Sequence, residues 1–266
     1  MAKPCLVIFM TLPCLSLLLA SRVAEDLPRR VDGGGHLLRM RVDGTGTPAV
    51  VLEIGLGGFL EEWAAVQPDV ARRTRVAAYD RLGARHAMSP ISGREIAREL
   101  HRALVSAQVN PPYILVGQSF GAIYNRIFAA IYPGEVAGLV LLDPAQEQFI
   151  DWMETHHPED GLSRFPRHHW PEALGIEATL EELKSLGPLP DVPVVVVTGT
   201  RRGQDAKRDA LLPVWTAMHR DWVRALPHGR HVLADKSGHG IQIDQPELVV
   251  DLIIELVEQA RARRVE

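Results

Sequence analysis

The sequence predicts an α/β protein with a mostly parallel sheet of about eight strands and helices on both faces of that sheet. Short apolar runs alternate with stretches of helical periodicity along most of the 266 residues. Each run is almost continuously apolar, which is typical of a strand buried on both faces. Most runs end at Gly, Asp or Thr, where turns are expected to begin. Strands that alternate with helices indicate parallel pairing.

Six apolar runs are expected to form the inner strands: Ala49–Ile54, Arg75–Tyr79, Ile114–Val116, Gly138–Leu142, Val192–Val197 and His231–Ala234. A further run, His36–Val42, precedes them and is followed after a short gap by Val50–Ile54. This hairpin-like spacing predicts antiparallel strands at one edge of the sheet.

Four segments between the strands have the periodicity of helices. Ser92 and Glu95 form a capping-box pattern, after which apolar residues recur every four positions to about Ala107. Residues 122–132 are apolar at helical spacing and are followed by Pro133-Gly134, which ends a helix. Asp209–Leu226 and Glu247–Arg261 are the remaining clear helices.

Residues 146–190 interrupt the alternation and contain no strand pattern. They hold several prolines, two pairs of histidines and four aromatic residues: Phe149, Trp152, Phe165 and Trp170. A long insertion between two strands is usually functional or mobile. We therefore expect a small helical lid over the carboxyl edge of the sheet, within a single domain spanning residues 25–266. A helical excursion without a function is the alternative.

The first 24 residues form a leader of different composition. Lys3 is followed by an apolar stretch of about fifteen residues and then by small and polar residues, which is typical of a secretory signal peptide or an uncleaved anchor. We expect an exported protein, or a cytoplasmic one if the start is mis-assigned, with membrane contact only through an uncleaved leader. Both cysteines, Cys5 and Cys14, lie in the leader, so no disulfide is expected in the domain.

The composition excludes several classes of protein. Lys and Arg total 29 and Asp and Glu total 33, giving a net charge of −4, which argues against nucleic acid as a partner. An apolar fraction of 46% is too high for a disordered chain. The histidine pairs at 156–157 and 168–169 lack the spacing and carboxylate support of a metal site. No metal and no organic cofactor is expected.

The motif that carries chemistry is Gly117-Gln118-Ser119-Phe120-Gly121, a match to G-x-S-x-G. It follows a predicted strand and opens a predicted helix, and in that context the pattern marks a nucleophilic serine on a sharp turn. The turn is expected to strain the backbone of Ser119 and to raise its Oγ above the sheet. Side chains at positions 117 and 121 would collide with the neighbouring helix and strand.

A serine hydroxyl is a weak nucleophile and needs a general base. The candidate is His239, which lies in Lys236-Ser237-Gly238-His239-Gly240 between the last predicted strand and the last predicted helix. Its glycine neighbours allow a loop to bring the imidazole over Ser119.

At this point the chain resembles the α/β-hydrolase superfamily, in its bacterial esterase- and haloperoxidase-like branch. The resemblance covers about residues 38–258. It rests on five pieces of sequence: Val51–Gly58, Tyr79–Gly83, Gly117–Gly121, Leu139–Pro144 and Ser237–His239. It implies an α/β-hydrolase fold and a catalytic triad in the chain order Ser, acid, His.

The resemblance implies an acid that orients His239. The family usually places it a few residues past a Gly after the penultimate strand, where this chain has Arg202, with Asp205 three residues later. Some members place it at the end of the preceding strand, where Asp143 lies. We favour Asp143, with Asp205 as the alternative acid.

The oxyanion of such a reaction is held by two main-chain amides. The resemblance implies the N–H of Phe120, directly after the nucleophile, and a second N–H from the glycine-rich segment that follows Ile54. Alignment gives Leu56 as this second donor, with Gly57 as the alternative.

These residues predict a serine hydrolase that cleaves a carboxylic ester or thioester through an acyl-enzyme. The aromatic residues of the lid indicate a small-molecule substrate with an apolar or aromatic portion. Two alternatives stay open. One is cofactor-free perhydrolase or C–C bond chemistry on the same triad. The other is a non-catalytic homologue that binds a ligand.

Overall fold

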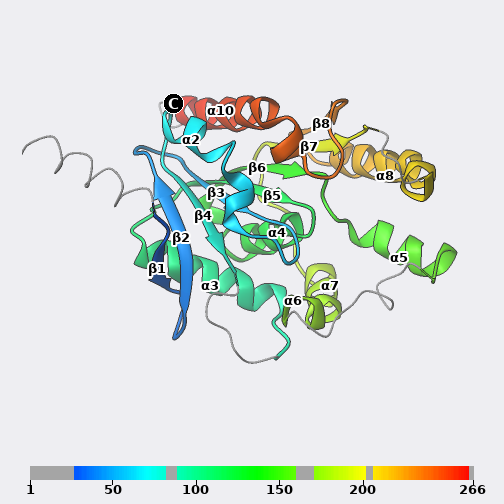
Figure 1. Cartoon of the computed structure of the whole chain (residues 1–266), viewed down its shortest axis with the longest axis horizontal. Helices are drawn as coiled ribbons and strands as arrows, with labels where there is room; N and C mark the ends of the chain where they lie inside the picture. Colours follow the sequence, from blue (N-terminus) through cyan, green and yellow to red (C-terminus); the bar gives the residue numbers. More distant parts are fainter. Residues whose placement is uncertain (1–26, 82–88, 160–170, 202–205, 264–266) are drawn as a thin grey trace, which may run out of the picture.

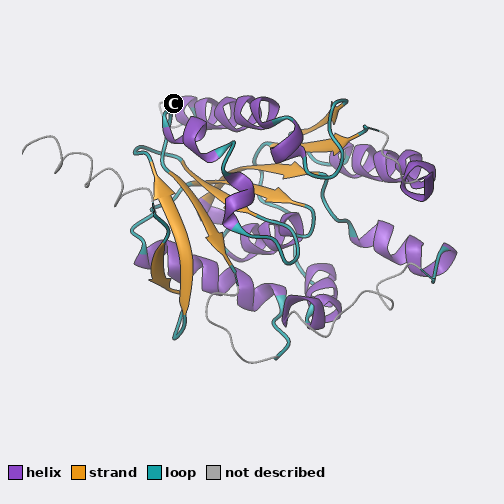
Figure 2. Ribbon diagram, in the orientation of Figure 1, coloured by secondary structure: helices purple, strands orange, loops and turns teal. Residues whose placement is uncertain are grey.

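The computed structural model describes residues 27–81, 89–159, 171–201 and 206–263. Within these residues the chain forms one eight-stranded sheet with helices on both sides (Figures 1 and 2). The strands are β1 (Arg29–Asp32), β2 (Leu37–Asp43), β3 (Ala49–Glu53), β4 (Val76–Asp80), β5 (Tyr113–Gln118), β6 (Val136–Leu142), β7 (Val194–Gly199) and β8 (Gly229–Ala234). The predicted fold class, an α/β protein with a mostly parallel sheet of about eight strands and helices on both faces, is confirmed.

The strand order across the sheet is β1-β2-β4-β3-β5-β6-β7-β8. From β4 to β8 all neighbours are parallel, whereas β2 is antiparallel to both β1 and β4. The antiparallel edge is thus confirmed, but its expected pairing is wrong. Val50–Ile54 belongs to the parallel interior, and β2 pairs instead with β1 and β4.

The helices lie between and beside the strands in chain order. They are η1 (Leu60–Trp63), α2 (Gln67–Ala71), α3 (Gly93–Ser106), α4 (Gly121–Ile131), η2 (Pro133–Glu135), α5 (Glu147–His156), α6 (Pro171–Leu174), α7 (Ile176–Lys184), α8 (Ala206–Arg224), α9 (Ile241–Asp244) and α10 (Pro246–Ala262). The capping box at the start of α3 is confirmed: Ser92 Oγ accepts from the Glu95 amide, and the Glu95 carboxylate accepts from the Ser92 amide.

Alternate residues of the inner strands enter two separate hydrophobic cores. Val51, Leu115 and Leu139 pack with α3, α4 and α7, whereas Val50 and Ile114 pack with α2 and α10 on the other face. This period of two explains why the inner strands are apolar without a break. The strand β8 is the exception, because it lies at the edge of the sheet and is only half-buried. Our expectation that it is buried on both faces is therefore wrong.

The insertion at residues 146–190 contributes α5, α6 and α7, and its described part contains no strand. The short helix α6 and the longer α7 lie beside one end of α3, whereas α5 extends away from the body of the molecule (Figure 1). The insertion leaves the carboxyl end of β6 and leads into the amino end of the parallel strand β7, so it begins at the carboxyl edge of the sheet and crosses to the opposite edge.

Candidate active site

Ser119 lies on the turn between β5 and α4, with a φ of +53°. Its N–H donates to the Leu142 carbonyl at 2.9 Å, which ties the turn to the end of β6. A non-glycine residue in the left-handed region is uncommon and costs free energy. The strain expected at Ser119 from the sequence is therefore confirmed.

The two glycines of the motif are required by close backbone contacts. A Cβ at Gly121 would lie 2.5 Å from the Ile54 carbonyl oxygen, and a Cβ at Gly117 would lie 2.8 Å from the Ala122 Cα. Real Cβ atoms do not approach so closely. The predicted collisions with the neighbouring strand and helix are confirmed.

Asp143 follows β6 directly and is also in the left-handed region, with a φ of +43°. Its carboxylate is buried. Oδ1 accepts from the Trp215 indole N–H at 2.8 Å and from the Gly199 amide at 3.2 Å. Oδ2 lies 2.6 Å from Nδ1 of His239. Both carboxylate oxygens thus have fixed partners.

His239 lies on the loop between β8 and α9, and its side chain is 43% exposed. The Gln118 side chain donates from Nε2 to the His239 carbonyl at 3.1 Å. Because Gln118 directly precedes Ser119, this bond joins the histidine loop to the serine turn. The structure thus pairs His239 with Asp143 and joins the loop that carries His239 to the turn that carries Ser119.

The histidine loop is also held by Asp244 and Gln245, which follow it, and by Arg201, which follows β7. The Gly238 amide donates to Asp244 Oδ2 at 2.9 Å, and Arg201 pairs with the same oxygen at 2.8 Å. Ser237 Oγ donates to the Gln245 side-chain oxygen at 2.9 Å. The loop therefore has bonded support both before and after His239.

A chain of polar side chains lies behind Asp143, in which His219 and Thr198 are buried and His231 is half-buried. His219 Nε2 is 2.8 Å from the Pro144 carbonyl, and because a carbonyl only accepts, this nitrogen carries a proton. His219 Nδ1 is 2.7 Å from the Thr198 hydroxyl, which is 2.8 Å from His231 Nε2. Burial lowers the pKa of His219 to about 4. A neutral His219 that accepts from Thr198 and donates to Pro144 satisfies every bond in this chain.

The loop after β3 passes directly beside the serine. A Cβ placed on Gly55 would lie 3.1 Å from the Ser119 Cβ. The Gly58 amide donates to the Gly55 carbonyl at 3.2 Å, and Gly57 has a φ of +69°, so residues 55–58 form a tight turn. Leu56 lies at the first central position of this turn.

The amides named from the sequence as oxyanion donors differ in their surroundings. Within the described part of the chain, no acceptor is hydrogen-bonded to the N–H of Leu56 or of Phe120. The Gly57 N–H, the alternative donor, lies 3.5 Å from Glu172 Oε2 and is directed to it. Leu56 and Phe120 are thus the amides that are free to receive a further acceptor.

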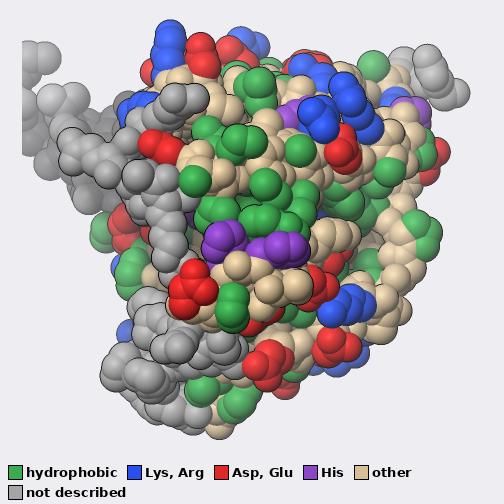
Figure 3. All heavy atoms as spheres, turned by 90° about the vertical axis from the view of Figure 1, so that its right-hand side faces the viewer, with side chains coloured by type: hydrophobic (Ala, Val, Ile, Leu, Met, Phe, Trp, Pro, Cys, Tyr) green, Lys and Arg blue, Asp and Glu red, His purple; other side chains and the backbone are tan. Residues whose placement is uncertain are grey.

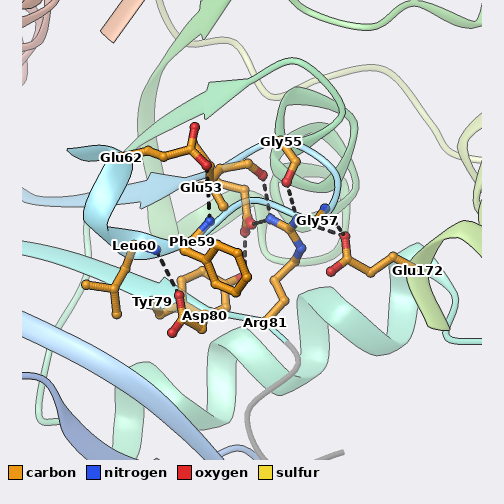
Figure 4. A network of polar contacts seen from close by, with 11 residues as sticks. Glu53, Gly55, Gly57, Phe59, Leu60, Glu62, Tyr79, Asp80, Arg81 and Glu172 are labelled. Carbon is orange, nitrogen blue, oxygen red and sulfur yellow. Dashed lines mark hydrogen bonds and ion pairs between the residues drawn. The ribbon is translucent and has the colours of Figure 1, made fainter. Parts of the chain in front are cut away.

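Arg81, directly after β4, holds the same loop from behind (Figure 4). Its Nη1 donates to Glu53 Oε1 at 2.6 Å and to the Ile54 carbonyl, and its Nη2 donates to Glu172 Oε2 at 2.8 Å and to the Gly55 carbonyl. The side chains of Arg81, Glu53 and Glu172 are all buried.

The electrostatics of this cluster follow from its burial. Burial disfavours the charge of Arg81, but the carboxylates of Glu172 and Glu53 outweigh that effect and raise the pKa of the guanidinium. Burial raises the pKa of Glu53, with Arg81 opposing the shift. Tyr79 donates its hydroxyl to the other oxygen of Glu53. Glu53, Tyr79, Arg81 and Glu172 are called the arginine cluster below.

Aromatic side chains extend from Asp143 into the insertion. Phe149 on α5 packs edge-on against Trp215, with ring centroids 4.5 Å apart, and stacks on Trp152 at 5.9 Å. All three are half-buried. Figure 3 shows the side of the molecule on which α5 and α8 lie in Figure 1, where hydrophobic side chains gather above a pair of histidines.

Several residues named from the sequence lie outside the described part of the chain. They are the leader at residues 1–24, the alternative acid Asp205, the aromatic residues Phe165 and Trp170, and the histidines His168 and His169. Across the four described ranges, no three His, Cys, Asp or Glu residues are grouped as a metal site would require. No helix in those ranges is long and apolar enough to span a membrane.

Sequence reasoning missed the residues that support the site from a distance. Trp215, His219 and Glu172 contact the predicted residues or their neighbours, yet no local motif assigns them there. Gln118 occupies a variable position of the serine motif, so the motif did not predict its bond to His239. For Glu53 a signal existed, because an acid at the end of an apolar strand needs a buried partner. The sequence analysis included Arg81 in the segment Tyr79–Gly83, but it did not predict that Arg81 pairs with Glu53.

The fold agrees with the comparison to known proteins. Residues 48–216 match the family described as alpha/beta hydrolase fold. Because this match covers more than half of the chain, the protein belongs to that family.

Individual relatives are distant. The uncharacterized protein YqjL of Bacillus subtilis is 26% identical over 225 residues, which cover 82% of this chain and 87% of YqjL. A thermophilic esterase from Thermogutta terrifontis superposes with a TM-score of 0.61 at 17% identity, covering 88% of this chain and 98% of the esterase. The enol-lactonase of Burkholderia xenovorans superposes with a TM-score of 0.59 at 19% identity, covering 85% of this chain and 98% of the lactonase. These two structures share the fold of this chain.

Proposed function

We propose that the protein is a serine hydrolase that cleaves a carboxylic ester or thioester through an acyl-enzyme. The observation that carries this proposal is the 2.6 Å contact between His239 Nδ1 and Asp143 Oδ2, beside a strained serine turn tied to the same loop by Gln118. The names of the two solved structures compared above, an esterase and a lactonase, both describe cleavage of an ester bond.

Asp143 is the acid of the proposed triad. Its carboxylate fixes the Nδ1–H tautomer of His239, so the lone pair of Nε2 is left to accept a proton. The bonds from Trp215 and Gly199 to Oδ1 keep the carboxylate in the orientation that directs Oδ2 to the imidazole. The alternative acid, Asp205, lies outside the described residues.

In the first half of the reaction, Ser119 Oγ attacks the carbonyl carbon of the substrate. The serine proton passes to His239 Nε2, and the carbonyl electron pair moves to the oxygen. The amides of Leu56 and Phe120 hold this oxyanion. When the tetrahedral intermediate collapses, the alcohol or thiol leaves with the proton from His239, and the acyl group stays on Ser119.

In the second half, water attacks the acyl-enzyme. His239 takes a proton from the water, the same amides hold the second oxyanion, and the acid product leaves as the Ser119 hydroxyl is restored. The free amides of Leu56 and Phe120 support their selection as donors over Gly57, whose N–H is directed to Glu172.

We propose that the substrate has an apolar or aromatic portion that packs against Phe149, Trp152 and Trp215. These rings are in mutual contact, and Trp215 bonds directly to the proposed acid. The insertion that carries α5 would then cover the substrate as a lid.

A fluorescent fluorophosphonate, which reacts with activated serines, tests the proposal on the purified full chain. We expect rapid labelling of the wild type and none of Ser119→Ala or His239→Ala. Ser106→Ala, which alters an exposed serine of α3, is the matched control and should label normally.

The same assay separates the two candidate acids. Asp143→Asn should label and hydrolyse esters roughly 10⁴-fold more slowly, because an amide favours the wrong tautomer of His239. Asp205→Asn should match the wild type. If a folded wild type neither labels nor hydrolyses any ester with detergent present, the proposal is wrong. Tight ligand binding that Ser119→Ala leaves unchanged would then favour the non-catalytic alternative.

A further inference from the structure

We propose that Arg81 is a positioning residue that orients the Leu56 amide of the oxyanion hole, and that Glu172 of the insertion anchors it. This inference rests on the proposed function, because it concerns how the oxyanion of that reaction is held. It assigns a role to the arginine cluster, which the hydrolytic steps themselves do not use.

The guanidinium engages two consecutive carbonyls of the loop. Nη1 donates to the Ile54 carbonyl and Nη2 to the Gly55 carbonyl, while the second hydrogen of each nitrogen goes to a carboxylate. Four donors of one planar group are therefore directed to four fixed acceptors. This fork geometry is particular to arginine, because an ammonium group cannot bond two carbonyls and two carboxylates in the same directions.

The bond to the Gly55 carbonyl determines where the Leu56 N–H points. The two groups belong to one planar trans peptide unit, in which C=O and N–H are directed to opposite sides. With its oxygen held by Arg81, the unit must present its N–H on the side away from the guanidinium. The cation also draws electron density toward that oxygen, which makes the N–H a stronger hydrogen-bond donor.

Glu172 connects this arrangement to the insertion. It lies on α6, 91 residues after Arg81 in the sequence, and its Oε2 bonds both the guanidinium and the Gly57 amide. The first bond fixes the arginine, and the second holds the other end of the tight turn. The turn at residues 55–58 therefore has all of its bonded partners only when α6 packs against it. This dependence couples the insertion to the reactivity of the serine.

The ion pairs that Arg81 forms with Glu53 and Glu172 are buried. Both ion pairs of Arg81 are among side chains that are at most 2% exposed, where solvent screens charges weakly. Glu53 holds the guanidinium from the strand side and Glu172 holds it from the insertion side. An arginine that served only to satisfy Glu53 would not need the two carbonyl bonds.

The test compares how wild type and Arg81→Lys bind two ligands with the same acyl chain. One is a trifluoromethyl ketone, to whose carbonyl carbon Ser119 Oγ adds, with the proton passing to His239 and the electron pair to the oxygen. The other is the matching amide, which binds without forming an oxyanion. We expect Arg81→Lys to bind the ketone roughly tenfold to a hundredfold more weakly, with amide binding nearly unchanged and a matching loss in kcat.

Arg126→Lys is the matched control. Arg126 is also largely buried and forms a two-bond pair with Glu147, and within the described residues it forms no hydrogen bond to the loop after β3. It should lose stability while binding the ketone as the wild type does. Glu172→Gln is the second variant, in case Arg81→Lys does not fold. It should weaken ketone binding in the same direction but by less, because Gln keeps an oxygen for the guanidinium.

Two results would show that Arg81 only supports the fold: an equal loss of affinity for the ketone and the amide, or unchanged ketone binding in both Arg81→Lys and Glu172→Gln. Either result would overturn this inference and leave the proposed function standing. If the wild type does not bind the ketone through Ser119, the proposed function fails, and the inference fails with it.

Discussion

Two sides of the proposed site are held by different kinds of bond. On the acid side, Asp143 receives neutral donors from Trp215 and Gly199, and the turn behind it is bonded to His219. On the oxyanion side, the loop after β3 is held by the arginine cluster, in which one cation lies between two buried carboxylates. On the acid side the groups that hold the carboxylate are neutral dipoles, whereas on the oxyanion side the groups that hold one another carry full charges.

The difference follows from what each side does in the proposed reaction. Asp143 must stabilise a positive charge on His239 that exists only transiently, and a permanent cation on the carboxylate would compete with it. Neutral donors orient the carboxylate without that competition. The oxyanion loop carries no charge before the reaction, so a charged cluster can hold its carbonyls from behind.

The largest stability difference should separate Arg81→Met from Trp215→Phe. Loss of Arg81 leaves Glu53 and Glu172 buried without a cation, which typically costs about 3–5 kcal/mol. Trp215→Phe keeps an aromatic ring but removes one hydrogen bond to a carboxylate, worth about 1.5–3 kcal/mol. Urea unfolding at neutral pH measures both changes in the free energy of unfolding.

A control variant, Arg126→Met, tests whether the loss of any buried arginine has the same effect. Arg126→Met removes an arginine whose partner Glu147 is less deeply buried, and it should cost less than Arg81→Met. If Trp215→Phe destabilised the protein as much as Arg81→Met does, the contrast between a neutral and a charged side would be wrong.

A smaller effect should appear as a pH dependence that arises on the acid side. The pKa of His219 is about 4 in the folded protein and 6.5 in the unfolded chain, so between these values the unfolded state binds more protons. The free energy of unfolding should therefore fall as the pH falls through this window, by roughly 3 kcal/mol in total. Burial also lowers the pKa of His231, which acts in the same direction.

Urea unfolding between pH 4 and pH 7.5 checks this slope. His219→Gln should be less stable than the wild type at pH 7.5 and should show a flatter dependence on pH. His228→Gln, which removes a half-exposed histidine near Asp191, is the matched control and should keep the wild-type slope. A wild-type slope retained in His219→Gln would contradict the assignment.

The sequence alone predicts the fold and the chemistry-bearing turns because those depend on local pattern. The inner strands and main helices lie within a few residues of their predicted bounds. The strain at Ser119 and the close contacts of Gly117 and Gly121 follow from one five-residue motif. His239 and Asp143 could be named because each follows a strand at a recognisable place in the chain.

The supporting contacts could not be predicted because they join residues far apart in the sequence. Trp215 is 72 positions from Asp143, and Glu172 is 91 positions from Arg81. Which partner meets a buried charge depends on how the helices pack over the sheet, and no local pattern encodes that. The pairing of β2 was wrong for the same reason, since β4 follows β3 in sequence but lies between β2 and β3 in the sheet.

The most direct test of the central claim is to trap the acyl-enzyme. The full-length wild type is mixed with an activated ester, quenched in acid within its first turnovers, digested with a protease and analysed by mass spectrometry. The account predicts that the peptide containing Ser119 gains one acyl group, and that this group is absent from Ser119→Ala. Steady hydrolysis with no acyl group on that peptide, or with an acyl group on another residue, would contradict the account.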